Sequence, residues 1–143
     1  MIESPVRQTF RVKTLKASSA VVATGNTGTS VKIPDALNAM GFVVDVTAAG
    51  TAAADTTNIY VQTKLDGTNW VDIYRATEIA GNGGAKRYIA KVTGALATAG
   101  FENGAALGEA AVRNMLGDEY RVRWVVVDDT DPSCTFSVTA IPM

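Results

Sequence analysis

The stretch that decides the fold is residues 58–74, which read Asn-Ile-Tyr-Val-Gln-Thr-Lys-Leu-Asp-Gly-Thr-Asn-Trp-Val-Asp-Ile-Tyr. Two runs that alternate apolar and polar residues flank a central Asp-Gly pair. Ile59, Val61 and Leu65 share one parity, so a strand here buries one face and exposes the other. Asp-Gly favours the left-handed backbone that a tight reversal needs. The stretch therefore predicts a β-hairpin.

Similar patterns recur along the chain and predict an all-β fold. Residues 40–47 alternate around Phe42, as a central strand does. The glycine-rich turns at residues 25–28 and 81–84 each predict a further hairpin, and the runs at 120–126 and 134–140 predict a final strand pair. About eight to ten short strands at this spacing favour an antiparallel β-sandwich or a small, jelly-roll-like barrel, with at most one or two short helices.

The chain divides into a short N-terminal segment and one domain. After Pro5, apolar residues from Val6 through Val12 alternate with basic residues, and residues 1–16 are expected to form an N-terminal strand or an extended arm. Residues 17–143 are expected to form a single β-sandwich domain with an Ala/Gly-rich insertion at about 94–116. Within the insertion, Leu107, Ala111 and Met115 fall four apart and predict one short helix.

Composition excludes several classes of function. The 143 residues carry a formal net charge of −1 and no basic block, which argues against direct binding to nucleic acid. The sequence contains no run of about 18 apolar residues, so it predicts no membrane span. No signal peptide is apparent, and we expect synthesis in a cytoplasm. The single cysteine excludes an intrachain disulfide.

The absence of histidine removes most familiar catalytic chemistry. Without histidine there is no Ser-His or Cys-His nucleophile, and most zinc sites are excluded. Cys134 alternates with Phe136 and Val138, which favours a small core residue over a reactive thiol. We therefore expect no catalytic residues, no cofactor and no metal site.

Acidic residues leave two alternatives open. Asp128, Asp129 and Asp131 crowd one loop, where a hard cation would find carboxylates, but the same residues are typical of a solvated turn. A glycosidase needs two carboxylates about 5 to 9 Å apart. The candidates for such a pair, among which the sequence gives no reason to choose, are Asp45, Asp72, Glu78 and Asp128.

Three aromatic residues suggest a different alternative. Trp70, Tyr74 and Trp124 would form a stacking platform for sugars if they lay on one exposed face. Parity with Val122 and Val126 favours a core position for Trp124, while Trp70 stands beside the hairpin turn. A carbohydrate- or receptor-binding β-sandwich module of a tail or secreted protein is therefore the alternative function.

The order of the motifs resembles a known family. The chain presents Phe-Val-Val-Asp-Val-Thr-Ala-Ala-Gly from residue 42 and Val-Gln-Thr-Lys-Leu-Asp-Gly-Thr-Asn-Trp-Val-Asp-Ile from residue 61. Tyr-Arg-Val-Arg-Trp-Val-Val follows from residue 120 and Cys-Thr-Phe-Ser-Val-Thr-Ala from residue 134. This pattern resembles the small β-sandwich proteins of tailed-bacteriophage virions, in particular capsid decoration (cement) proteins and related virion accessory proteins. The insertion at 94–116 is longer than the connection typical of such domains.

The resemblance implies a structural role. Such proteins sit on the outer surface of an assembled shell of major capsid protein, often as trimers, and stabilise it. It therefore implies a homo-oligomer located in the virion, assembled in the host cytoplasm, with no membrane or nucleic-acid partner. It carries over no interface residues.

Interface residues are instead predicted from the N-terminal pattern. Ile2, Val6, Phe10 and Val12 are apolar residues of a segment that no tight turn joins to the next strand. A free edge with apolar side chains is a means of pairing with another subunit or with the shell. The alternative is that this segment is the first strand of the domain's own sheet.

Overall fold

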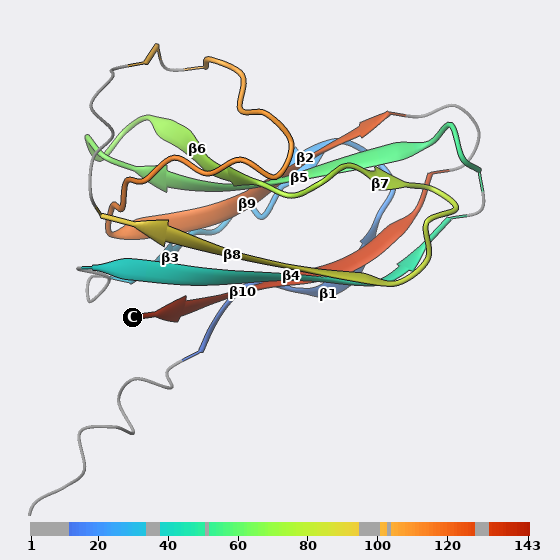
Figure 1. The fold of residues 1–143 in the computed structure, drawn as a ribbon, viewed down its shortest axis with the longest axis horizontal. Coiled ribbons are helices and arrows are strands. Elements are labelled where there is room, and N and C mark those ends of the chain that lie inside the picture. Colours follow the sequence, from blue (N-terminus) through green and yellow to red (C-terminus); the bar gives the residue numbers. More distant parts are fainter. Residues whose placement is uncertain (1–11, 34–37, 51, 95–100, 103, 128–131) are drawn as a thin grey trace, which may run out of the picture.

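Alternating side chains along the chain form the inner and outer faces of a two-layer β-sandwich (Figure 1). The fold is taken from a computed structural model that describes residues 12–33, 38–50, 52–94, 101–102, 104–127 and 132–143. All the regular secondary structure in these ranges is β-strand, so the all-β prediction is confirmed. The strands are β1 (Lys13–Val21), β2 (Gly25–Asn26), β3 (Val31–Lys32), β4 (Ala39–Ala49), β5 (Thr56–Lys64), β6 (Trp70–Arg75), β7 (Ile79–Ala80), β8 (Lys86–Thr93), β9 (Glu119–Val127) and β10 (Cys134–Pro142).

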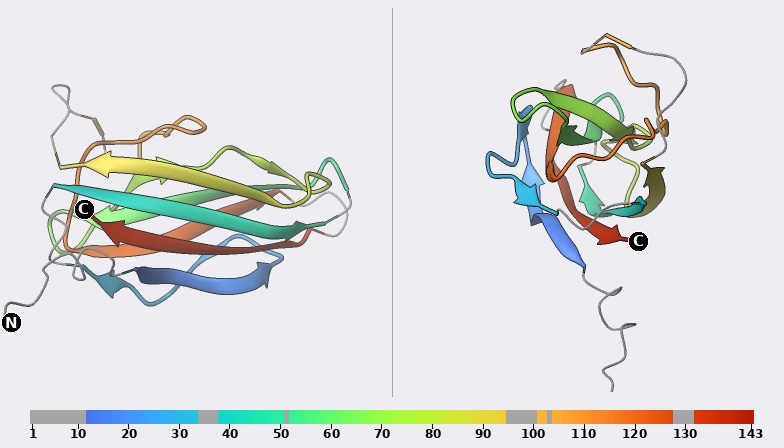
Figure 2. Two further views of the ribbon diagram at one scale, coloured as in Figure 1. Left: turned by 60° about the horizontal axis from the view of Figure 1, so that its bottom comes forward. Right: turned by 90° about the vertical axis from the view of Figure 1, so that its left-hand side faces the viewer.

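The strands form two antiparallel sheets. Sheet A has the order β1-β10-β4-β8. Sheet B has the order β2-β9-β5-β6, with β3 also paired to β9 and β7 to β5. Sheet A lies below sheet B in Figure 1, and the end-on view of Figure 2 shows the two layers facing each other. The predicted sandwich is therefore the observed architecture.

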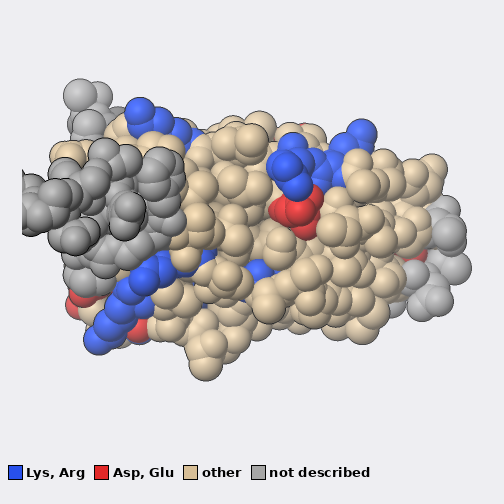
Figure 3. All heavy atoms as spheres, turned by 90° about the horizontal axis from the view of Figure 1, so that it is seen from below, with Lys and Arg blue, Asp and Glu red and all other residues tan. Residues whose placement is uncertain are grey.

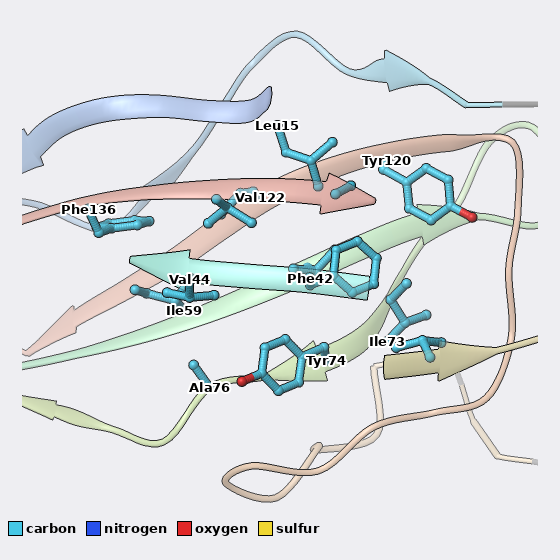
Figure 4. Packing of buried hydrophobic residues seen from close by; sticks show 14 of the residues in the cluster. Leu15, Phe42, Val44, Ile59, Ile73, Tyr74, Ala76, Tyr120, Val122 and Phe136 are labelled. Carbon is cyan, nitrogen blue, oxygen red and sulfur yellow. The ribbon is translucent and has the colours of Figure 1, made fainter. Parts of the chain in front are cut away.

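The core lies between the sheets and follows the parity of the sequence. Met40, Phe42, Val44 and Val46 of β4 are all buried, as predicted for a central strand. Their counterparts from sheet B include Tyr120, whose ring centroid lies 6.2 Å from that of Phe42. Figure 4 shows these side chains meeting from both layers. Apolar burial of this kind supplies the main stabilising free energy of the fold.

The Asp-Gly hairpin is confirmed and joins β5 to β6. Asp66 Oδ1 accepts hydrogen bonds from the amides of Thr68 at 2.9 Å and Asn69 at 2.7 Å, and these bonds lower the pKa of Asp66 to about 2. Gly67 adopts φ +77°, which glycine accommodates without steric cost. The expectation that Leu65 shares the buried face is wrong, because β5 ends at Lys64 and Leu65 belongs to the exposed turn.

The three other predicted strand pairings are wrong. The piece predicted before the turn at 25–28 overlaps the end of β1, which pairs with β10, and the piece after the turn contains β3, which pairs with β9. β2 lies within the predicted turn and also pairs with β9. β7 pairs with β5 in sheet B, whereas β8 pairs with β4 in sheet A. Likewise β9 and β10 lie in different sheets. Turn residues show where the chain reverses, and they do not determine whether the next strand returns to the same sheet or crosses to the other.

The insertion contains no helix in its described part, contrary to prediction. Residues 111–113 instead run along the free edge of β6, where Arg75 N donates to Ala111 O at 3.1 Å and Arg113 N donates to Ile73 O at 2.8 Å. Gly104 and Ala110 both have positive φ, at 92° and 58°, which breaks helical continuity. The segment therefore covers a sheet edge, and Figure 1 draws it as an orange coil beside β6.

The predicted boundary at residue 16 also differs from the structure. β1 begins at Lys13 and pairs with β10 from Lys13↔Ala140 to Val21↔Cys134. Residues 13–16 thus belong to sheet A, and Leu15 contributes to the core. The part of the predicted arm up to residue 11 lies outside the described residues.

Candidate interaction surfaces

The predicted interface residues lie at the start of sheet A. Ile2, Val6 and Phe10 are outside the described residues. Val12 directly precedes β1 and is 56% exposed, so it lies at the surface beside the edge of sheet A. The structure therefore describes one of the four predicted interface residues, Val12.

Cys134 is a core residue, as its parity predicts. It is 1% exposed and lies opposite Val21 in the β1–β10 pairing. Burial raises the pKa of its thiol, which further disfavours the reactive thiolate. The interpretation of Cys134 as a buried, small apolar side chain is confirmed.

Two of the candidate acids for a carboxylate pair lie on opposite faces of the sandwich. Asp45 lies on the outer face of sheet A and Asp72 on the outer face of sheet B, so the whole sandwich separates them. Glu78 accepts a hydrogen bond from Asn58 Nδ2 at 3.0 Å. Among the described residues, no group of three or more Cys, Asp or Glu is placed to hold a metal ion. Asp128, Asp129 and Asp131 fall outside them.

The outer face of sheet B instead carries a polar network centred on Asp72. Arg123 donates to both carboxylate oxygens of Asp72, at 3.0 and 2.9 Å. Gln62 extends the network, because its Nε2 donates to Asp72 Oδ1 at 2.9 Å and its Oε1 accepts from Arg121 Nε at 2.7 Å. The bonds to Asp72 raise the pKa of Arg123, whereas burial and then the charge of Arg123 lower the pKa of Arg121.

Aromatic rings extend this network and are covered by its cations. The ring of Trp70 has Arg121 at 4.4 Å and Lys64 at 4.7 Å from its centroid. Arg123 lies 3.9 Å from the ring centroid of Tyr60. Such contacts are favourable cation–π interactions. Two cations of the same chain therefore occupy positions against the ring of Trp70 that a stacking sugar would have to share.

The other two aromatic candidates lie elsewhere. Tyr74 is buried in the core. Trp124 packs edge-on against Phe136 at 5.8 Å, and its Nε1 donates to Ala23 O at 2.9 Å. The three aromatic residues of the carbohydrate hypothesis therefore share no common surface.

A buried lysine that the sequence analysis missed lies near the edges of the two sheets. Lys16 is 6% exposed, and its Nζ donates to the carbonyls of Phe136 at 2.9 Å and Ser19 at 3.1 Å and to Ser19 Oγ at 3.0 Å. Its ammonium also lies 4.1 Å from the ring centroid of Phe136. Burial lowers the pKa of Lys16. These contacts satisfy the hydrogen-bonding capacity of the ammonium group and link β1 to β10 beside the register shifts of β1. The lysine therefore has a structural role.

The outer face of sheet A has a different character, because its two central strands, β10 and β4, carry almost no charge and the cations Arg87 and Lys91 lie on its edge strand β8. Along β10 and β4 the outward positions are mostly small, hydroxylic or apolar: Thr135, Ser137, Thr139, Ile141, Gly41 and Val43. Asp45 interrupts this face and is paired with Arg87 of β8 at 3.3 Å. Figure 3, which views this side of the molecule, shows a broad uncharged area together with several separate groups of Lys and Arg side chains.

No model of a known protein family matches the chain, and a search of curated proteins found no match. No helix among the described residues is long and apolar enough to cross a membrane. The two outer faces of the sandwich therefore provide the argument for function.

Sequence parity contained a signal for both faces. The polar residues of the network alternate with core residues along their strands: Gln62, Asp72, Arg121 and Arg123. A bulge between Val61 and Gln62 shifts the register of β5 against β6. The pairing of β9 with β5 and of β5 with β6 then brings them together. The β9–β5 pairing connects strands that are distant in sequence, which is why the network was missed.

Proposed function

We propose that this protein is a virion structural protein that binds the outer surface of an assembled capsid shell and stabilises it, as decoration proteins do. The observation that carries the proposal is the nearly uncharged outer face of β10 and β4, the two central strands of sheet A. The centres of protein–protein interfaces are depleted in charged residues, because a desolvated charge needs a partner. A face of hydroxyl, methyl and backbone groups loses its water at low cost.

Rigidity supports the same proposal. β4 and β10 lie in the middle of sheet A, hydrogen-bonded on both sides, and bury Phe42, Val44, Phe136 and Val138 on the opposite side. A face held in this way loses little conformational entropy on binding. The partner we propose is the shell of major capsid protein.

Oligomerisation is part of the proposal. The apolar positions Ile2, Val6 and Phe10 precede β1 in the sequence, and Val12 lies exposed next to it. We expect this segment to contact a neighbouring copy or the shell, with a trimer as the form that the resemblance suggests. Assembly then takes place in the host cytoplasm, and the protein remains on the capsid surface.

Binding to shells tests the proposal. Thr139 lies at the centre of the outer face, so Thr139→Glu would place an unpaired carboxylate within the contact, while Thr77→Glu makes the same change at an exposed site after β6 in sheet B. Shells of the major capsid protein from the same particle are mixed with each variant and sedimented. We expect Thr77→Glu to co-sediment like the unchanged protein and Thr139→Glu to lose binding by about tenfold or more.

Circular dichroism of both variants provides the folding control. Equal co-sedimentation of the two variants would show that the outer face is not the contact. Failure of the unchanged protein to bind any shell would contradict the proposed function itself.

A further inference from the structure

The edges of the two sheets differ in how they are protected. β1 is interrupted by register shifts between Thr14 and Lys16 and between Lys16 and Ser19. The edge of sheet B beside β9 consists of two strands of two residues each, and residues 111–113 cover β6. Bulges, short strands and covering segments are the usual means of blocking edge-to-edge association.

β8 has no bulge and no covering segment along most of its length within the described part of the chain, so charged side chains are its main protection. It spans eight residues and pairs with β4 without a register shift, from Lys86↔Val46 to Thr93↔Ala39. Thr93 N donates to Asn114 Oδ1 at 3.2 Å, so its amide points away from β4. Since strand amides alternate in direction, the amides of Arg87, Ile89 and Lys91 also point outward. None of these three has a backbone partner among the described residues.

The side chains on this edge show what kind of strand it fits. Arg87, Ile89 and Lys91 all project from the outer face of sheet A, and Ile89 is 75% exposed. Lys91 has no ion pair within the described residues, and the Arg87–Asp45 pair is itself exposed. The edge thus offers an apolar side chain between two cations.

Charge disfavours a second copy of β8 paired about Ile89. An antiparallel β8–β8 pair centred on Ile89 would place Arg87 opposite Lys91 at both ends. Like charges directly opposite each other destabilise a strand pair. The complementary strand instead has an acidic residue at i and i+4 and an apolar residue at i+2.

We propose that the free edge of β8 binds an extended acidic segment of another protein by strand addition, with acids opposite Arg87 and Lys91 and an apolar side chain opposite Ile89. Backbone hydrogen bonds provide the affinity in this mode of recognition, and the alternate side chains provide the specificity. The inference concerns the edge of sheet A, and it holds whether or not the outer face binds a shell.

The probe is a blocked peptide, Thr-Glu-Thr-Val-Thr-Glu-Thr, and the control peptide has lysine in place of glutamate. Amide chemical shifts of the isotope-labelled full-length protein are followed during titration at low salt, where exposed charges are least screened. We expect saturable shifts at Arg87, Ile89 and Lys91 with the acidic peptide, and at least about fivefold weaker binding of the lysine peptide.

Three variants test the mode of binding. Lys91→Glu reverses an edge charge and should weaken the acidic peptide about fivefold, while Lys13→Glu makes the same change at the opposite edge and should have no effect. Ile89→Pro removes an outward amide and leaves the amides that bond β4 in place, so the protein should fold and lose binding.

The alternatives give different results. Equal binding of both peptides, or no binding by either, would overturn the proposal. A concentration-dependent dimer that Ile89→Pro abolishes would overturn it in favour of a second copy as the occupant.

Discussion

At the scale of single residues, the two outer faces use the same chemistry for different purposes. Asp72 pairs with Arg123 at 2.9 Å in a partly buried network, whereas Asp45 pairs with Arg87 at 3.3 Å near solvent. A carboxylate that accepts several hydrogen bonds in a partly buried place contributes to stability, but an exposed ion pair contributes little. The first pair stabilises sheet B, and the second neutralises a charge on sheet A.

Matched substitutions measure this difference. We expect Asp72→Asn to lower the free energy of unfolding by about 1–3 kcal/mol, because Arg123 loses its charged acceptor. Asp45→Asn should change it by less than about 0.5 kcal/mol. Urea unfolding of both variants provides the measurement. Equal effects would show that the network around Asp72 is not a stabilising unit.

At the scale of elements, β1 determines how much of the N-terminal segment is part of the domain. Its pairing with β10 begins at Lys13, and Leu15 and Lys16 are both buried. Residues 1–11 lie outside the described part of the chain. We expect the distinction between an interaction arm and a structural strand to fall near residue 12, just before β1.

Two deletions separate the roles. Removing residues 1–11 should leave the free energy of unfolding within about 0.5 kcal/mol of the full chain but abolish the oligomer, as followed by analytical ultracentrifugation. Removing residues 1–16 also removes the Leu15 contacts and should cost about 2–5 kcal/mol. An unfolded product from the shorter deletion would contradict the arm.

The individual strands also show which parts of the fold could be predicted from the sequence. Parity correctly predicted which residues of β4, β9 and β10 face the core, since burial on one face imposes a period of two. It could not predict that β9 and β10 lie in different sheets, because side-chain alternation is the same whichever strand becomes the neighbour. The position of residues 111–113 along the edge of β6 could not be predicted either, because these residues show no alternating strand pattern. The surfaces proposed for binding follow from those pairings and were equally hidden.

At the scale of the whole molecule, the two sheets share one core that contains ionisable groups. Tyr120 is fully buried, and its hydroxyl donates to Gly117 O at 2.8 Å. Burial raises the pKa of Tyr120 from 10.0 to about 12. Above pH 10 the unfolded chain releases this proton and the folded protein retains it, so stability falls as pH rises.

An alkaline titration of stability checks this coupling. The free energy of unfolding should fall by about 2–3 kcal/mol between pH 10 and pH 12 on account of Tyr120. Tyr120→Phe should remove that part of the decline, and its effect at pH 7 provides the baseline. An unchanged alkaline slope in the variant would assign the decline to other groups.

The pairing of the first and last strands has a mechanical consequence. β1 and β10 are antiparallel neighbours, and Lys13 lies opposite Ala140, so the described chain starts and ends at the same end of sheet A. A force that separates these two ends loads the hydrogen bonds of the pair one after another, as in the opening of a zipper. A force along the strands of the outer face would instead load many bonds at once. A shell that expands under internal pressure would therefore be restrained better by contacts spread over the face than by a tether at the two ends of the chain.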